Sequence, residues 1–134
     1  MLVTDLPVHH KIIAKLENKN ISELTEIQEK TILPALQGKD IIASSKTGSG
    51  KTFAFLVPAI NRLMSQKALS RQDPRALILA PTRELAMQIA KDAEQLCGYT
   101  GHNVVTVVGG MNYDKQRDQL QNEIVDILVA TPGR

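Results

Sequence analysis

The sequence has 134 residues, the length of a single domain, which is enough for one hydrophobic core. Hydrophobic residues make up 43% and charged residues 22%, as is typical of soluble globular chains, and the net charge of +2 permits nucleic-acid binding without arguing for it. The single cysteine, Cys97, excludes an internal disulfide framework and is expected to be a packed side chain. There is no apolar stretch of membrane-spanning length and no signal peptide, so we expect a cytoplasmic protein.

Two helices are predicted before the first strand. Apolar residues at helical spacing predict a helix over about residues 9–19. Thr25 can cap a second helix that runs to about Leu36 and is stopped by Gly38.

Strands and helices then alternate along the chain. The expected strands cover residues 40–43, 76–80, 104–108 and 124–130. The expected helices cover residues 51–65, 83–97 and about 113–121. The strands are continuous aliphatic runs, as expected when both faces of a parallel sheet are covered. This order predicts an α/β fold, a layered sandwich around a mainly parallel sheet.

A glycine-rich run between the first expected strand and the following helix has the character of a phosphate-binding loop. The residues concerned are Ser45, Lys46, Thr47, Gly48, Ser49, Gly50, Lys51 and Thr52. Glycines let several backbone N–H groups converge on one anion, and the positive end of the helix dipole adds to the attraction. Lys51 would then reach the β and γ phosphates, and the Thr52 hydroxyl would bind the accompanying Mg²⁺. Ser45 stands where the strict pattern has its first glycine, but the context still predicts nucleoside triphosphate binding.

Three further loops follow expected strands. They are Pro81-Thr82-Arg83, Gly109-Gly110 and Thr131-Pro132-Gly133-Arg134. Ligands collect at the carboxyl ends of strands in such sheets, so we expect these loops and the phosphate loop to open on one edge.

Together these motifs resemble those of the DEAD-box RNA helicases. The phosphate loop resembles the family's Ala-x-Thr-Gly-x-Gly-Lys-Thr, and the segment from Pro81 to Ala86 reproduces its Pro-Thr-Arg-Glu-Leu-Ala. The double glycine and the final Thr-Pro-Gly-Arg follow in the family's order. The resemblance covers essentially the whole chain and implies a RecA-like P-loop three-layer sandwich that binds ATP with Mg²⁺.

The resemblance also implies roles for particular residues. Gln28, in Leu24-Thr25-Glu26-Ile27-Gln28, looks like the family's adenine-reading glutamine. Val3 stands where the family has an aromatic residue that stacks on adenine. Because valine cannot stack in this way, the affinity for the base would be lower. The residues implied to grip the RNA backbone are Pro81, Thr82, Arg83, Gly109, Gly110, Thr131, Pro132, Gly133 and Arg134. Because none of these residue types reads base edges here, binding should be independent of sequence and sensitive to salt.

The resemblance further predicts the domain organisation. Residues 1–134 would be part of an amino-terminal RecA-like ATP-binding domain, with an adenine-reading helical segment over about 1–37 and a P-loop α/β core over 38–134. The Asp-Glu-Ala-Asp segment and the second RecA-like domain, a partner in the family, are not among these residues. We therefore expect the fragment to bind nucleotide without hydrolysing it. Strands left without neighbours would also favour self-association.

Two other classes of function stay open. One is a different P-loop enzyme, such as a small-molecule kinase or a DNA-translocating helicase. The other is a non-catalytic module that binds RNA or nucleotide. The effect of RNA or DNA on nucleotide affinity would discriminate the first, and calorimetry with ADP, GDP and a Lys51→Ala control would discriminate the second, since indifference to both nucleotides favours the module.

Overall fold

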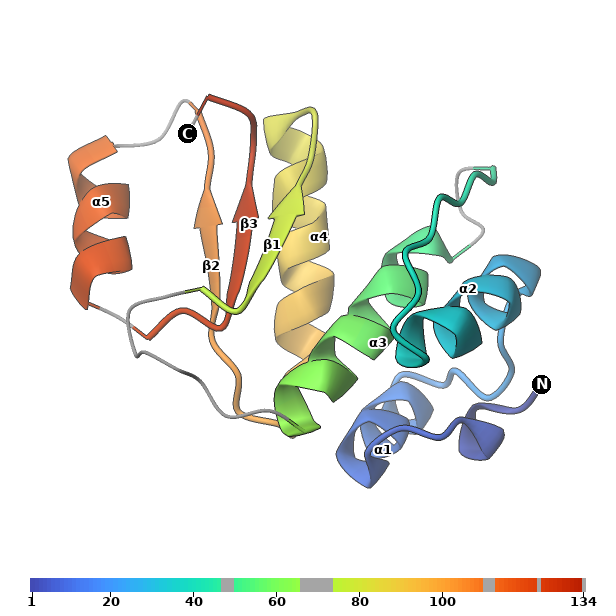
Figure 1. Cartoon of the computed structure of the whole chain (residues 1–134). Coiled ribbons are helices and arrows are strands. Elements are labelled where there is room, and N and C mark those ends of the chain that lie inside the picture. The colour runs from blue at the N-terminus through green and yellow to red at the C-terminus, as the bar shows by residue number, and fades with distance from the viewer. Residues whose placement is uncertain (47–49, 66–73, 110–112, 123, 134) are drawn as a thin grey trace. The chain divides into compact units, whose positions relative to one another are not determined.

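The computed structural model describes residues 1–46, 50–65, 74–109, 113–122 and 124–133. The chain divides into two compact units, Met1–Gln66 and Lys67–Arg134. Figure 1 shows the helical first unit in blue to green and the sheet-containing second unit in yellow to red. Each unit is described by itself.

The first unit consists of helices. A short 3-10 helix, η1 (Val3–Asp5), precedes α1 (His10–Asn18), α2 (Glu26–Leu36) and α3 (Lys51–Ser65). The two helices predicted before residue 40 are thus confirmed within one residue at each end, and the helix predicted over 51–65 is confirmed. The core of the first unit comes from the inward faces of these helices and includes Ile12, Leu16, Ile32, Leu56, Val57 and Ile60.

The α2 helix begins with a reciprocal cap. The Thr25 hydroxyl accepts a hydrogen bond from the backbone N–H of Gln28, and the Gln28 side-chain oxygen accepts one from the backbone N–H of Thr25. Such a box satisfies two amides that would otherwise lack partners in the first turn. Past the other end of the helix, Gly38 has a φ of 86°, the left-handed conformation that glycine adopts without strain.

The strand predicted over residues 40–43 does not form, which corrects that expectation. Residues 39–46 take part in no strand pairing in the described part of the chain, and Ile42 is fully exposed. An aliphatic run becomes a strand only where a neighbour offers matching N–H and C=O groups. The segment before the phosphate loop is therefore not a strand and has no regular secondary structure.

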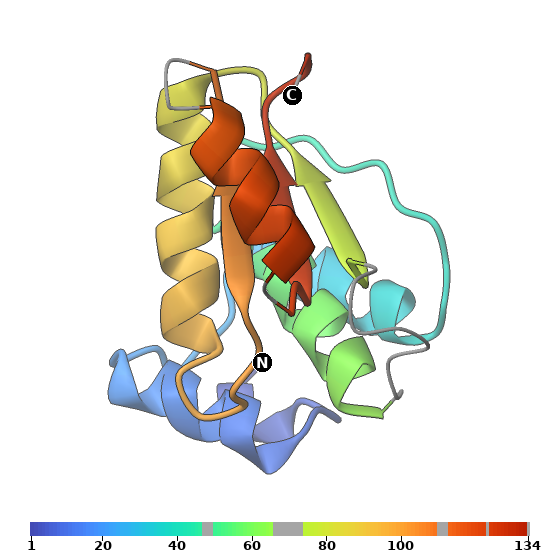
Figure 2. The ribbon, with the colours of Figure 1, turned by 90° about the vertical axis from the view of Figure 1, so that its left-hand side faces the viewer.

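The second unit is a three-layer arrangement around a parallel sheet. Strands β1 (Ala76–Leu79), β2 (Val104–Val107) and β3 (Ile127–Ala130) pair in the order β1-β3-β2, and both pairings are parallel. Helix α4 (Arg83–Leu96) packs on β2 and β3, and α5 (Tyr113–Asn122) packs on β2. Figures 1 and 2 show α4 and α5 on opposite faces of the sheet. The predicted α/β class with a parallel sheet is confirmed.

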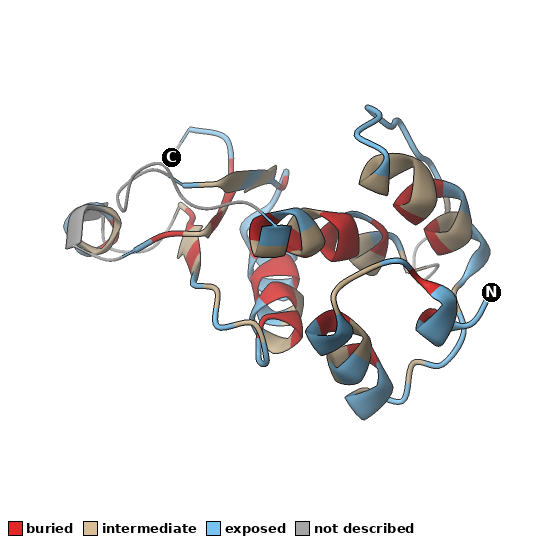
Figure 3. Cartoon of the chain, turned by 60° about the horizontal axis from the view of Figure 1, so that its bottom comes forward, coloured by how far each residue is buried: buried red, intermediate tan, exposed pale blue. Residues whose placement is uncertain are grey.

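The core of this unit lies between the sheet and its helices. The inward residues of α4 recur at helical spacing and form one buried stripe, which Figure 3 shows in red. On the other side, a cluster of Val105, Val107, Val125 and Ala130 packs against Leu120 of α5 and Leu128 of β3. Within the described residues, no helix combines the length and the apolar character needed to cross a bilayer.

Two details of the strands differ from the sequence-based expectation. β3 begins at Ile127, three residues later than predicted, because its partners begin there: Ile127 pairs with Ala76 on one side and Val104 on the other. β1 was expected to be covered on both faces, but Leu77 and Leu79 remain 61% and 62% exposed. The reason is that β1 is an edge strand and α4 packs on the other two strands.

Candidate functional site

Gly50 holds the junction between the phosphate loop and α3. Its φ is +90°, and a Cβ built on it would lie 2.4 Å from Gln28 Nε2 and 3.0 Å from Thr25 Oγ1. Both the backbone conformation and the lack of space therefore require glycine. Its carbonyl accepts the α3 hydrogen bond from the Ala54 N–H at 3.2 Å and a second from Gln28 Nε2 at 3.1 Å.

Gln28 is 4% exposed, and both ends of its amide bond to the chain itself. The oxygen caps α2 through Thr25, and the nitrogen holds the Gly50 carbonyl. A glutamine amide offers two donor hydrogens and two acceptor lone pairs, and these two bonds use one of each. The structure thus gives the predicted base reader a direct connection to the phosphate loop.

Lys51 is the first residue of α3, and its side chain contacts Ser45. Its ammonium group donates a hydrogen bond to the Ser45 carbonyl at 2.7 Å. Thr52 follows in the first turn of the helix and is half-buried. The predicted loop residues Thr47, Gly48 and Ser49 lie outside the described residues.

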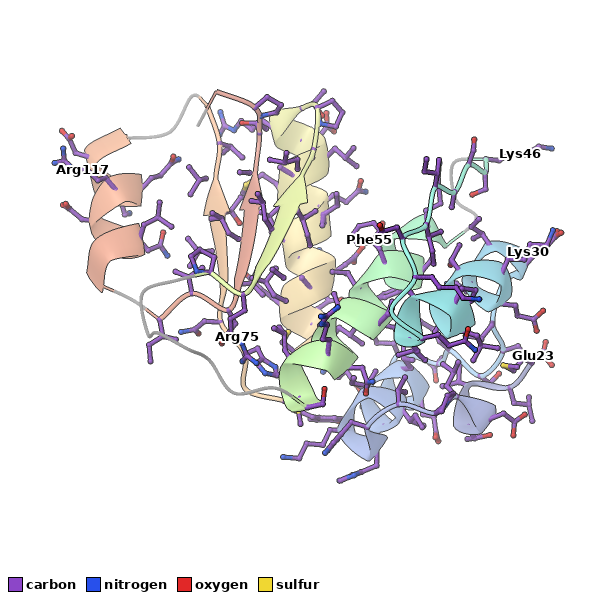
Figure 4. All side chains as sticks on the ribbon, viewed as in Figure 1. Glu23, Lys30, Lys46, Phe55, Arg75 and Arg117 are labelled. Carbon is purple, nitrogen blue, oxygen red and sulfur yellow. The ribbon has the colours of Figure 1, made fainter. Side chains whose placement is uncertain are left out.

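A pocket of about 500 Å³ adjoins this junction. Its walls are the first turn of α2 and the entry to the loop, with Thr25, Glu26, Ile27, Lys30, Ser44, Ser45 and Lys46 as lining residues. Lys30 projects from α2 and Lys46 from the segment that leads into the loop (Figure 4). The volume is within the usual range for small-molecule sites.

An ion pair lies on the pocket wall. Lys30 and Glu26 form an exposed ion pair of 2.8 Å, one helical turn apart. Hydrogen bonding to Lys30 lowers the pKa of Glu26, and the same bond raises the pKa of Lys30. Both groups are therefore charged at neutral pH.

The second unit gathers three of the predicted loops at the carboxyl edge of its sheet. Ala80, at the end of β1, donates to the Ala130 carbonyl at 3.0 Å, and Thr131 donates to the Val107 carbonyl at 3.2 Å. The loops that follow β1, β2 and β3 therefore start side by side, at the top of the sheet in Figure 1. The phosphate loop belongs to the other unit.

Most of the described residues in these loops are accessible, but Thr131 is not. Pro81, Thr82 and Arg83 are exposed where α4 begins, and the Thr82 hydroxyl caps the helix by accepting from the Leu85 N–H at 3.2 Å. Pro132 and Gly133 are exposed, and Thr131 is buried. The predicted residues Gly110 and Arg134 lie outside the described residues.

Gly109 differs from Gly50 in what it requires. Its φ is outside the left-handed region, and a Cβ placed on it would meet nothing within 4 Å among the residues that the structure describes. The described part of the fold therefore does not demand glycine at this position.

Cys97 is buried at the end of α4, as expected. Burial raises the pKa of its thiol to about 11, so the thiolate that a nucleophile requires is scarce at neutral pH. Cys97 is a packing residue.

Two interactions escaped the sequence-based prediction. The Gln28–Gly50 bond had a partial signal, since Thr25-x-x-Gln28 matches a capping box that directs the glutamine towards the helix start. The second is the hydrogen bond from the Gln116 side chain to the Val108 carbonyl. Gln116 is a buried polar residue that shares a helix face with Leu120, four residues later.

Comparisons with known proteins are consistent for both units. The ATP-dependent RNA helicase RhlB of Xanthomonas oryzae pv. oryzae is 48% identical over 130 residues, which cover 95% of this chain and 22% of the relative. RhlB of Pseudomonas aeruginosa is 53% identical over 113 residues, covering 82% of this chain and 28% of the relative. The chain thus spans about a quarter of the length of these relatives.

Solved structures similar to this chain are also those of RNA helicases. A structure described as DEAD-box helicase Mss116 bound to ssRNA and UDP-BeF matches with a TM-score of 0.90 and 33% identity, covering 100% of this chain and 29% of that one. An Mss116p structure bound to ssRNA and AMP-PNP matches with a TM-score of 0.91 and 33% identity, covering 100% and 28%. The fold is therefore that of the Mss116 RecA-like domain. Residues 25–134 match the DEAD/DEAH box helicase family, and the chain belongs to this family.

Proposed function

We propose that this chain is the ATP-binding and RNA-gripping part of an ATP-dependent RNA helicase, in which ATP binding and hydrolysis are coupled to RNA binding and local duplex unwinding. The observation that carries the proposal is the Gly50 junction. A left-handed glycine with no room for a Cβ precedes a helix whose first residue is a lysine, beside a pocket of about 500 Å³. This geometry suits a polyphosphate.

Lys51 would change partners when nucleotide binds. It donates to the neutral Ser45 carbonyl at 2.7 Å. A phosphate oxygen offers the same ammonium a charge-assisted hydrogen bond, which is stronger. We therefore assign Lys51 to the β and γ phosphates and the remaining loop residues, Ser45 to Gly50, to the cradle.

Thr52 fits the accompanying Mg²⁺. Mg²⁺ prefers oxygen ligands and is usually held by few protein groups together with the phosphates. A single hydroxyl in the first turn of α3 satisfies that demand. The metal would neutralise charge on the phosphates, and Thr52 would hold it at the loop.

The carboxyl edge of the sheet in the second unit would bind the RNA backbone. Arg83 and the amino end of α4 offer positive charge, and the open backbone at Gly109 offers close approach. The Mss116 structures, which hold ssRNA with UDP-BeF or AMP-PNP, support both classes of ligand for this chain. The partner in the intact protein would be a second RecA-like domain.

Calorimetry with ADP tests the nucleotide site. We expect Lys51→Ala to lose about 1.5–3 kcal/mol of binding free energy, the scale of a charge-assisted hydrogen bond. Lys39→Ala, an exposed lysine outside the loop, is the matched control and should bind as the unchanged chain does. Equal affinities for all three proteins would reject the phosphate-binding role.

Adding a single-stranded RNA or a DNA of the same sequence tests the coupling. A shift in AMP-PNP affinity with RNA alone supports the helicase assignment. An equal shift with DNA indicates a DNA-translocating enzyme, and indifference to both indicates a binding module.

We also propose that this chain alone does not hydrolyse ATP, because none of the residues assigned above orients an attacking water. Steady phosphate release above the Lys51→Ala background would contradict this.

A further inference from the structure

Gln116 carries a buried amide that is only half satisfied. The residue lies on α5 and is 4% exposed. Its Nε2 donates a hydrogen bond to the Val108 carbonyl at 3.0 Å. Its Oε1 is buried and has no hydrogen-bond partner among the described residues. Unpaired buried acceptors are few in folded proteins, so this one needs an explanation.

Its surroundings would suit an apolar side chain. Leu120, on the same face of α5, packs against the cluster of Val105, Val107 and Val125. A methionine would fill a similar volume without burying a polar atom. What the glutamine adds at this position is its donor to Val108.

That donor determines the orientation of one peptide group. The Val108 carbonyl and the Gly109 N–H belong to the same planar trans peptide, and no peptide bond in the described chain is cis. In a trans peptide the C=O and N–H point in opposite directions. Gln116 therefore directs the Gly109 N–H away from α5.

The neighbouring carbonyl is held as well. The Val107 carbonyl accepts from Thr131, the first residue of the loop after β3. Two consecutive carbonyls at the end of β2 thus anchor two of the loops assigned to RNA. One anchor is backbone, and the other is the Gln116 side chain.

We propose that Gln116 is a positioning residue for RNA: it orients the Gly109 N–H towards a backbone phosphate. The unpaired Oε1 is the cost of placing the amide nitrogen on Val108, because the flipped amide would set two oxygens against each other. The proposal rests on the assignment of this sheet edge to RNA.

Gln116→Met separates positioning from packing. It removes the donor and the unpaired acceptor together, so the thermal unfolding midpoint should stay unchanged or rise. Affinity for a fluorescein-labelled single-stranded uridine oligoribonucleotide should fall by about 10-fold, the worth of one hydrogen bond. ADP affinity should not change. Gln88→Met, an exposed glutamine on α4, is the control and should alter none of these.

Gln116→Glu supplies a pH signature. Burial raises the pKa of such a carboxyl, and only its protonated form can donate to Val108. RNA affinity of this variant should therefore recover towards that of the unchanged chain as pH falls, beyond any change the unchanged chain shows. Protonation of a buried carboxylate also restores stability, so the unfolding midpoint is followed at each pH, and recovery of RNA affinity while the variant stays fully folded at every pH marks the donor role.

The outcomes distinguish the positioning role of Gln116 from the assignment of this sheet edge to RNA. If the unchanged chain binds the RNA and Arg83→Ala weakens that binding, yet Gln116→Met binds normally, the positioning role is wrong and the RNA assignment stands. If the midpoint and the RNA affinity of Gln116→Met fall together and Gln116→Glu shows no recovery at low pH, Gln116 is a packing residue. If the unchanged chain shows no salt-sensitive RNA binding, both proposals fail.

Discussion

The side-chain nitrogen of Gln28 donates a hydrogen bond to the backbone carbonyl of Gly50, 3.1 Å away. The same carbonyl accepts the first-turn hydrogen bond of α3 from Ala54. The start of α2 and the start of α3 are therefore joined through one peptide group. A change at Gln28 is therefore expected to affect the phosphate loop, and a change in the loop to affect Gln28.

Gly50→Ala should destabilise the first unit strongly. Alanine is strained at a φ of +90°, and its Cβ would displace the Gln28 amide from both of its hydrogen bonds. We expect a loss of about 2–4 kcal/mol in the free energy of unfolding, from the left-handed strain and the lost hydrogen bonds combined. Urea titration of the variant measures it.

Gly38→Ala is the matched control for this change. Gly38 has a similar φ of +86°, but a Cβ there would meet nothing within 4 Å in the described part of the chain. The Gly38→Ala variant should lose only the free energy of unfolding that corresponds to the left-handed strain, about 1–2 kcal/mol. Equal losses in the two variants would show that the contact with Gln28 contributes nothing.

Gln28→Glu should reduce both nucleotide affinity and base preference. A glutamate keeps the acceptor that caps α2 but loses the donor to Gly50. Calorimetry with ADP, GDP and UDP should show a smaller preference for adenine, by about 1–3 kcal/mol, since a base hydrogen bond goes unmade. Unchanged preference across the three nucleotides would reject the base-reading role.

Gly109→Ala should weaken RNA binding with little effect on stability. Among the described residues the new Cβ meets nothing within 4 Å, and its φ lies outside the left-handed region, so the unfolding midpoint should hold or rise slightly. On the ligand side, the methyl group should keep a phosphate from the backbone. We expect RNA affinity to fall about 10-fold, the worth of one hydrogen bond, in a fluorescence anisotropy titration.

Gly101→Ala should behave in the opposite way. Gly101 has a φ of +79° and lies before β2, at the other end of the strand. Its replacement should lower the unfolding midpoint and leave RNA affinity unchanged. If both variants lost RNA affinity equally, Gly109 would have no special role.

Leu79→Lys should reduce self-association. Leu79 is exposed on the edge strand, and unpaired strand edges favour pairing between copies. The edge sequence Ala76-Leu77-Ile78-Leu79-Ala80 is palindromic, so two copies could pair antiparallel with matched side chains. Light scattering over a concentration series should show a lower mean mass for the variant than for Met87→Lys, which alters an exposed apolar residue on α4. A monomeric unchanged chain would contradict the prediction.

Local elements of this protein follow from its sequence alone. The Thr25 cap, the start of α3 at Lys51 and the parallel β-α alternation depend on residues close together in the chain, and all are present in the structure. The family motifs were readable for the same reason, since each is a short contiguous string.

Tertiary structure decided the rest. The run over residues 40–43 has strand character but joins no ladder, and Leu77 and Leu79 are apolar but lie exposed on an edge. Gln28 and Gln116 both hold backbone carbonyls of other segments, 22 and 8 residues away. Pairing, burial and such long contacts depend on which segments meet in space, and a sequence pattern describes each segment only by itself.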